Sequence, residues 1–285
     1  MTKLLGASFC WLPVFALCVS SVRINGADEP AKTVALEKVP VAARKTIQEE
    51  AGHAAIGKIQ TGEEDGKQTY TVSLGEGGHD RQLTVAADGT LLSKDLTLEQ
   101  CPPPVGHTIQ GQLKGGTLEN IAETYDNDDI YFEVTATRKD GTERAFSVGL
   151  DGKLLSVDVA LEEIPAAVRK TIETSLGGGK LENVTHMFEE DGNSYYVEFM
   201  RNGQERDLSV GEDGKLQSME VFLPELSPAV QKTIREKLGE GTVVRIDKSF
   251  EVREEGFPYE VEGRKDGRPF NFSVSPRGKF LGLDE

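Results

Sequence analysis

The chain has 285 residues, of which 48 are Asp or Glu and 32 are Lys or Arg, so its formal net charge at pH 7 is −16. A charge of this sign is repelled by nucleic acid and by anionic membrane surfaces, which excludes both as general partners. Only three residues are cysteines, so a disulfide framework is excluded as well.

Residues 1–27 have the pattern of a secretory signal peptide. Lys3 supplies the positive start, Leu4–Val22 is a largely apolar run, and small residues follow up to Ala27. Cleavage near Ser20 is an alternative to cleavage after Ala27. The sequence predicts export to the periplasm or the extracellular space, without membrane attachment after cleavage. An uncleaved membrane anchor stays open as a second reading, because the apolar run approaches the length that spans a bilayer.

Cys101 is the only cysteine beyond this segment, so the mature chain cannot form an intramolecular disulfide. A lone cysteine in an exported protein raises the question of a redox or nucleophilic role. However, the repeat described next places Cys101 where the other copies have Val39, Ile164 and Leu226. We therefore expect a small buried hydrophobic side chain at this position.

Two sequence features recur with one spacing and indicate an internal repeat. The first is a Thr-Ile pair, found at Thr46-Ile47, Thr108-Ile109, Thr171-Ile172 and Thr233-Ile234. The second is a turn pair, found at Asp88-Gly89, Asp151-Gly152, Asp213-Gly214 and Arg277-Gly278. Both features predict tandem copies of about 62 residues. After the signal peptide the predicted copies are residues 28–97, 98–159, 160–221 and 222–285.

The third copy shows the expected elements most clearly. Ile164, Val168, Ile172 and Leu176 form a helical apolar stripe, which Gly177–Gly179 ends. Four short strands follow, separated by turn pairs at Asp191-Gly192, Asn202-Gly203 and Asp213-Gly214. The predicted fold class is α+β, with four tandem repeats that each pack one helix on a four-stranded antiparallel meander sheet.

The second strand of each copy alternates with a period of two and defines an inner and an outer face. In the third copy Tyr195, Val197 and Phe199 are expected to face the helix, so Tyr196 and Glu198 face outward. In the second copy Phe132 and Val134 are expected inside, with Tyr131 and Glu133 outside. Because tyrosines are frequent anchors in interfaces, the candidate partner-binding residues are Tyr131, Glu133, Tyr196 and Glu198. The alternative is that aromatic residues simply favour strands.

Charge differs between the hairpin turns. The first turns are acidic, with Glu63-Glu64-Asp65, Asp126–Asp129, Glu189–Asp191 and Glu254-Glu255. The second turns are more basic, with Arg138-Lys139, Arg201, Arg264-Lys265 and Arg268, and weaker in the first copy with His79 and Arg81. This pattern fits a surface for a basic partner, head-to-tail contact between copies, or solvated hairpin tips.

No catalytic or metal-binding constellation is found in the sequence. The four histidines fall at different places in the repeat, so they do not form a ligand set. Asp126–Asp129 has the acidic start of a calcium loop but lacks the glycine at position six, and position twelve is Thr137 instead of Glu. The sequence therefore predicts a protein that is not an enzyme and uses no cofactor or metal.

The residues Leu161–Ile172, with the pattern Leu-x-x-Ile-Pro-x-x-Val-x-x-Thr-Ile, are followed by a Gly-rich stop, Tyr-x-Val, and Asp-Gly-Lys-Leu at Asp213–Leu216. This arrangement resembles the PepSY-like, beta-lactamase-inhibitor-like exported domains. The resemblance covers nearly all of the mature chain once per copy, and the fourth copy departs from it at Ser227 and Arg277. It implies bacterial periplasmic or cell-surface modules without catalytic residues. Some relatives inhibit enzymes through the open sheet face, and PepSY domains are thought to restrain proteases.

The leading hypothesis is an exported, non-enzymatic protein that binds or inhibits a protein partner, such as an envelope or secreted enzyme, on its open sheet faces. Two alternatives belong to other classes. One is a structural or scaffolding component of the cell envelope, and the other is a weak calcium binder that uses the acidic hairpin turns.

Overall fold

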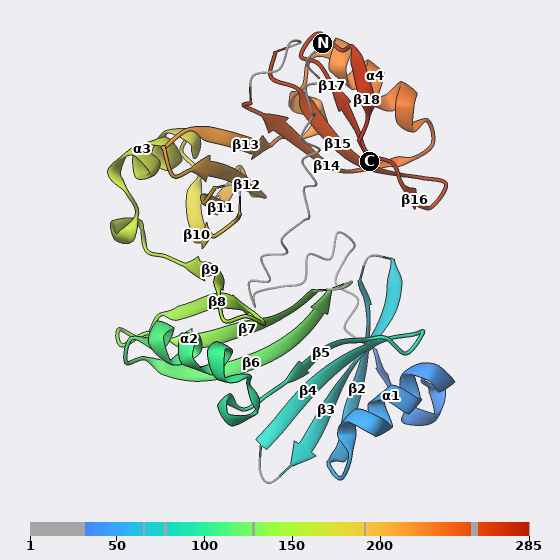
Figure 1. Ribbon diagram of the computed structural model, residues 1–285. Helices are drawn as coiled ribbons and strands as arrows, with labels where there is room; N and C mark the ends of the chain where they lie inside the picture. Colours follow the sequence, from blue (N-terminus) through green and yellow to red (C-terminus); the bar gives the residue numbers. More distant parts are fainter. Residues whose placement is uncertain are drawn as a thin grey trace, which may run out of the picture. The chain divides into compact units, whose positions relative to one another are not determined.

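The computed structural model describes residues 32–284, except residues 65, 77–78, 127–128, 191 and 252–255 (Figure 1). The predicted signal peptide lies outside the described residues. The chain divides into two compact units. Unit 1 contains the residues up to Cys101 together with Thr117–Ala136, and unit 2 contains Pro102–Gly116 together with Thr137–Glu285. Within the described residues, every helix is too short or too polar to cross a membrane.

Short helices and strands follow one another in a recurring order. Up to Cys101 the elements are β1 (Thr33–Val34), the 3-10 helix η1 (Leu36–Lys38), α1 (Val41–Ala51), β2 (Ala55–Glu64), β3 (Lys67–Glu76), β4 (His79–Ala86), β5 (Leu91–Asp95) and η2 (Leu98–Gln100). Next come α2 (Pro103–Leu113), β6 (Thr117–Asp126), β7 (Asp129–Thr137), β8 (Glu143–Gly149), β9 (Leu154–Asp158) and η3 (Leu161–Glu163). They are followed by α3 (Ala166–Ser175), β10 (Lys180–Met187), β11 (Ser194–Arg201), β12 (Gln204–Gly211), β13 (Leu216–Glu220) and η4 (Leu223–Glu225). The last elements are α4 (Pro228–Leu238), β14 (Thr242–Ser249), β15 (Tyr259–Lys265), β16 (Arg268–Pro269), β17 (Phe272–Val274) and β18 (Phe280–Leu283).

The prediction of four repeats that each have their own four-stranded sheet is wrong. The described strands belong to one 18-stranded sheet. The last strand after one helix pairs with the first strand after the next helix, in the pairs β5–β6, β9–β10 and β13–β14. The hydrogen bonds from Leu96 N to Ile121 O and from Val159 N to Val184 O extend these ladders. They form because almost no chain separates one predicted copy from the next. Pairing of this kind protects edge strands that four separate sheets would leave open.

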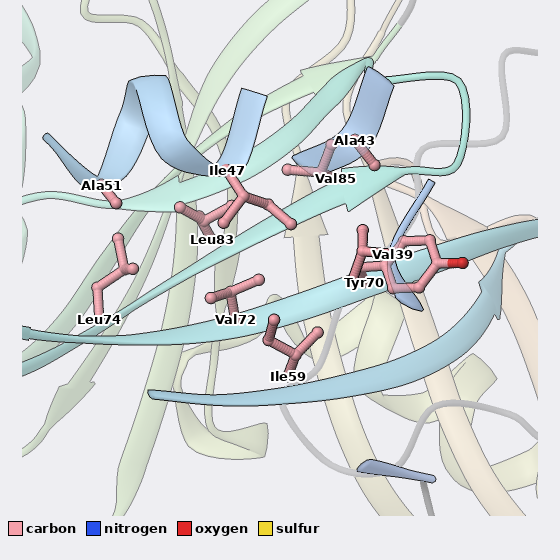
Figure 2. Packing of buried hydrophobic residues seen from close by; sticks show 10 residues of the cluster. All are labelled: Val39, Ala43, Ile47, Ala51, Ile59, Tyr70, Val72, Leu74, Leu83 and Val85. Atoms are coloured by element: carbon pink, nitrogen blue, oxygen red, sulfur yellow. The ribbon is translucent and has the colours of Figure 1, made fainter. Parts of the chain in front are cut away.

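Each helix packs on the sheet through the apolar stripe that the sequence predicts. Figure 2 shows this for α1, where Ala43, Ile47 and Ala51 point toward buried side chains such as Val72 and Leu83. The same arrangement recurs under α3, where Val168 and Ile172 join the core with residues of β11 and β12. Burial of these side chains removes apolar surface from water and supplies the main favourable contribution to folding.

The two recurring sequence features meet in space. The hydroxyl of the threonine in each helix donates a hydrogen bond to the carbonyl oxygen of the glycine in the third turn. The pairs are Thr46–Gly89 (2.7 Å), Thr108–Gly152 (2.7 Å), Thr171–Gly214 (2.6 Å) and Thr233–Gly278 (2.5 Å). Gly214 has a φ of 79°, and a Cβ there would lie 2.9 Å from the Cβ of Ala167. Only glycine allows this close approach of turn and helix.

Cys101 confirms the prediction of a small buried hydrophobic residue. It is free and 8% exposed, and Val39, Ile164 and Leu226 at the corresponding places are buried as well. Burial raises the pKa of the Cys101 thiol, with smaller contributions from Glu123 and Glu99. A thiol with a raised pKa is a poor nucleophile, so the residue acts in packing.

Candidate functional site: the polar face of the sheet

The structure places the four predicted partner-binding residues on the sheet face opposite the buried core positions. In β11, Tyr195, Val197 and Phe199 are buried in the core, and Tyr196 and Glu198 alternate with them on the other face. Both outward residues are half-buried instead of exposed. The tyrosine anchors are therefore less accessible than the alternation alone suggests.

In β7, Phe132 and Val134 are buried, and Tyr131 and Glu133 are half-buried on the opposite face. Tyr131 and Glu133 belong to unit 1, and Tyr196 and Glu198 belong to unit 2. The four residues thus form two patches, one in each unit.

The patch in unit 2 is built around a buried ion cluster that the sequence analysis missed. The Arg245 guanidinium, on β14, donates to both carboxylate oxygens of Asp207 on β12, with Nη1 2.6 Å from Oδ2. It also donates to both oxygens of Asp247, with Nε to Oδ2 at 2.5 Å and Nη2 to Oδ1 at 2.6 Å. Asp207 is 1% exposed. Two-pronged contacts of this kind are among the strongest polar interactions in proteins.

Tyr196 joins this cluster, because its hydroxyl donates a hydrogen bond to Asp207 Oδ2 at 2.9 Å. Glu198 lies directly across the β11–β12 ladder from Asp207, where two like charges alone would be unfavourable. Arg245 offsets this repulsion and in turn lies across the β14–β15 ladder from Glu262. Although burial by itself would lower the pKa of Arg245, its hydrogen bonds to Asp207 and Asp247 raise the pKa above the usual range. The arginine is therefore always charged here.

In the unit 1 patch, the carboxyl group of Glu133 lies near the carboxylate of Glu64. Burial raises the pKa of Glu133 to about 7, and the negative charge of Glu64 on β2 adds to the shift. Burial also raises the pKa of Tyr131, followed by the charges of Glu133, Asp126 and Glu64. At neutral pH the Glu133 carboxyl is therefore partly protonated, which makes this patch sensitive to pH.

One sequence signal could have revealed the cluster in unit 2. In the repeat register, Arg245 stands where the preceding copies have Asn120 and Asn183. Each of these asparagines donates to an aspartate at the end of the preceding fourth strand, Asn120 to Asp95 at 3.2 Å and Asn183 to Asp158 at 3.1 Å. An arginine in place of asparagine indicates that more carboxylate groups lie near this position where the fourth copy joins the third.

The side chains of this face offer hydrogen-bonding and ion-pairing groups to a partner. Across the described parts of the chain, no three Asp, Glu, His or Cys side chains are grouped so that they could hold a metal ion. Asn127 and Asp128 of the acidic turn lie outside the described residues. Half-buried tyrosine and carboxylate groups next to a fixed arginine can accept hydrogen bonds and ion pairs from a partner.

No protein-family model and no curated protein sequence matches the chain. Similar solved structures include a periplasmic protein of unknown function from Bacteroides vulgatus, which is 16% identical and covers 46% of this chain and 99% of its own, with a TM-score of 0.31. A DUF2874 family protein from Bacteroides ovatus is 15% identical and covers 41% of this chain and 84% of its own, with a TM-score of 0.31. A BLIP-like protein from Bacteroides fragilis is 16% identical and covers 41% of this chain and 82% of its own, with a TM-score of 0.29.

All three TM-scores are near 0.3, so the proposal below rests on the residues of this chain.

Proposed function

We propose that the protein is an exported, non-enzymatic binding protein that docks a basic protein partner on the polar face of its sheet. The observation that carries this proposal is the net negative charge of that face. In unit 2 the Arg245 guanidinium is bonded to the carboxylates of Asp207 and Asp247. Glu198 lies across the ladder from Asp207, and Glu262 lies across the ladder from Arg245. A partner that presents Lys or Arg side chains would be attracted by this field and by the net charge of −16.

An exported location fits the signal-peptide pattern of residues 1–27. The periplasmic description of several similar solved structures agrees with it. The organisation as four PepSY-like copies is part of the same proposal. It is supported by the threonine–glycine hydrogen bond that occurs four times with the spacing of the sequence repeat.

The test is an affinity capture from envelope extract, with the chain from residue 28 onward as bait and mass spectrometry as the readout. The face variant Glu133→Gln/Glu198→Gln removes two carboxylates from the polar face and keeps their shape. The control variant Glu49→Gln/Glu173→Gln removes two exposed carboxylates from α1 and α3. We expect one stoichiometric partner whose recovery falls at least about fivefold with the face variant only, because interface charges of this kind contribute about 1 kcal/mol or more.

Equal recovery of the partner with both variants would show that the polar face is not the docking surface. Recovery of wall and membrane material alone would favour the scaffolding alternative. If a partner enzyme is captured, its rate with and without the bait tells inhibition from simple binding.

A further inference from the structure

A basic pocket of about 240 Å³ lies in unit 2, where the C-terminal end of α2 meets the turn before β8. Four cationic side chains and two carboxylates line it, namely Lys114, Arg138, Lys139, Arg144, Asp140 and Glu163. This excess of positive charge is unusual in a chain with a net charge of −16. None of these residues belongs to the polar sheet face, so the pocket is independent of the docking surface proposed above.

Arg144 is the buried cation of this pocket, with an exposed fraction of 7%. Its Nη1 donates to the backbone oxygen of Gln112 at 2.9 Å and its Nη2 to the side-chain Oε1 of Gln112 at 3.2 Å. Both acceptors are neutral. Within the described residues Arg144 has no carboxylate within the distance of an ion pair. Burial lowers the pKa of Arg144, and the nearby charge of Arg138 lowers it further.

The corresponding arginine one copy later is neutralised. Arg206 occupies the same place in β12 that Arg144 has in β8, and it is 1% exposed. It donates to both oxygens of Glu225 on η4, at 2.9 and 2.6 Å, and lies over the ring of Phe222. A buried charge normally has a partner of opposite charge. Arg206 has the Glu225 carboxylate, and Arg144 has no such contact within the described residues.

The carboxylates near Arg144 are engaged elsewhere. Glu163 on η3 corresponds to Glu225, and each accepts a cap hydrogen bond, from Ala160 N at 2.9 Å and from Phe222 N at 3.0 Å. Unlike Glu225, Glu163 lies 3.6 Å from a different arginine, at Arg138 Nη1. Asp140 accepts from the backbone and hydroxyl of Thr142, at 2.9 and 2.7 Å, within its own turn. The charges of Glu163 and Asp158 act on Arg144 from a distance without an ion-pair contact. The lining of the pocket still holds four cationic side chains against two carboxylates and keeps an excess of positive charge.

We propose that this pocket binds an oxyanion group, either a free phosphate or sulfate or the carboxylate of an acidic ligand, with Arg144 at its base and Lys114 and Lys139 at its rim. A volume of 240 Å³ holds one such group. Guanidinium and ammonium groups are the donors that proteins use for oxyanions. The bound anion takes the place that the Glu225 carboxylate has beside Arg206.

The test is a thermal unfolding series of the chain from residue 28 onward at constant ionic strength. Chloride is replaced stepwise by inorganic phosphate, by sulfate, or by a blocked glutamate tripeptide. A ligand that binds only the folded state raises the unfolding midpoint, and we expect a saturable rise of about 3 °C. A response to phosphate and sulfate identifies a free oxyanion as the ligand, and a response to the tripeptide alone identifies a carboxylate. No response to any probe beyond chloride overturns the proposal.

Three variants locate the response. Gln112→Glu supplies Arg144 with a carboxylate of its own, so it should raise the midpoint without probe and abolish the probe response. Lys139→Gln removes an exposed rim charge and should weaken binding about fivefold, and Lys153→Gln, an exposed lysine paired with Asp151 at 3.3 Å, should change nothing. An unchanged response in Gln112→Glu and Lys139→Gln would show that the anion binds elsewhere and would overturn the assignment.

Discussion

The two polar patches of the sheet face differ in how the charge of a central carboxylate is balanced. In unit 2, Asp207 is held between an arginine and a tyrosine hydroxyl, which compensate its charge, although Arg245 is shared with Asp247 and the patch keeps excess negative charge. In unit 1, Glu133 lies beside another carboxylate, and its pKa is raised to about 7. The arginine of the compensated patch stays charged, whereas the Glu133 carboxyl of the uncompensated patch in unit 1 changes its charge near neutral pH. Stability is therefore expected to depend on single residues in the first patch and on pH in the second.

The largest effect is expected for Arg245→Ala. The substitution leaves the buried carboxylate of Asp207 and the half-buried carboxylate of Asp247 without their common cation. Breaking one partner out of a buried ion pair costs about 3–5 kcal/mol. Urea unfolding of the variant measures this loss. Arg235→Ala on α4 is the control. It removes an exposed arginine whose one hydrogen bond within the described residues goes to Gln231, and it should cost less than about 0.5 kcal/mol.

A triple variant separates the cost of the uncompensated charge from the cost of lost packing. The changes Asp207→Ala, Arg245→Asn and Asp247→Thr introduce the residues found at the corresponding places one copy earlier, which are Ala145, Asn183 and Thr185. We expect it to recover most of the stability lost in Arg245→Ala, because replacing all members of an ion cluster is often nearly neutral. A triple variant as unstable as the single one would show that the ion cluster itself is required.

The uncompensated patch predicts a pH dependence of opposite sign to that of a normal salt bridge. Glu133 has an ordinary pKa of 4.5 in the unfolded chain and a raised pKa of about 7 in the folded protein. The unfolded state therefore loses its proton first, and the free energy of unfolding falls as the pH rises from about 4.5 to about 7. The loss is on the order of 3 kcal/mol and constant above that range.

Glu133→Gln should remove this contribution and be more stable than the native chain at pH 8, but not at pH 4. Unfolding curves of both proteins across this range give the difference, which cancels the titration of all other groups. Glu143→Gln, at an exposed position, is the matched control. A constant difference between native protein and Glu133→Gln at all pH values would contradict the raised pKa.

The sequence allowed a good prediction of local elements and a poor one of how they join. The recurrence of Thr171 and Gly214 located a helix and a turn, because the threonine hydroxyl donates to this turn and only glycine fits so close to the helix. The alternation in β11 correctly placed Tyr195 inside. Pairing of β13 with β14 was missed, since an edge strand carries no residue signal for the strand that will extend it. Asp207 and Arg245 are 38 residues apart, so their contact depends on that pairing.

A smaller effect is expected on the helix side of the sheet for Glu225→Gln. The variant leaves Arg206 buried without a carboxylate, and the cost should be about 2 kcal/mol because Glu225 itself is partly exposed. Hydrogen bonds from Arg206 lower the pKa of Glu225 to about 2. The stabilisation is therefore present above about pH 4.5 and lost as the pH falls through about 2. Acid unfolding of native protein and variant should converge below that value.

The smallest effect compares the two tyrosines directly. Tyr196→Phe removes the hydroxyl that donates to Asp207 at 2.9 Å, and a hydrogen bond to a charged acceptor contributes about 1–2 kcal/mol. Tyr131→Phe removes a hydroxyl from the patch whose carboxylate is uncompensated, so its stability should change by less than about 0.5 kcal/mol. Urea unfolding of both variants at pH 8 tests the contrast. Equal losses would mean that the two patches hold their tyrosines alike, and that only the pH dependence of Glu133 distinguishes them.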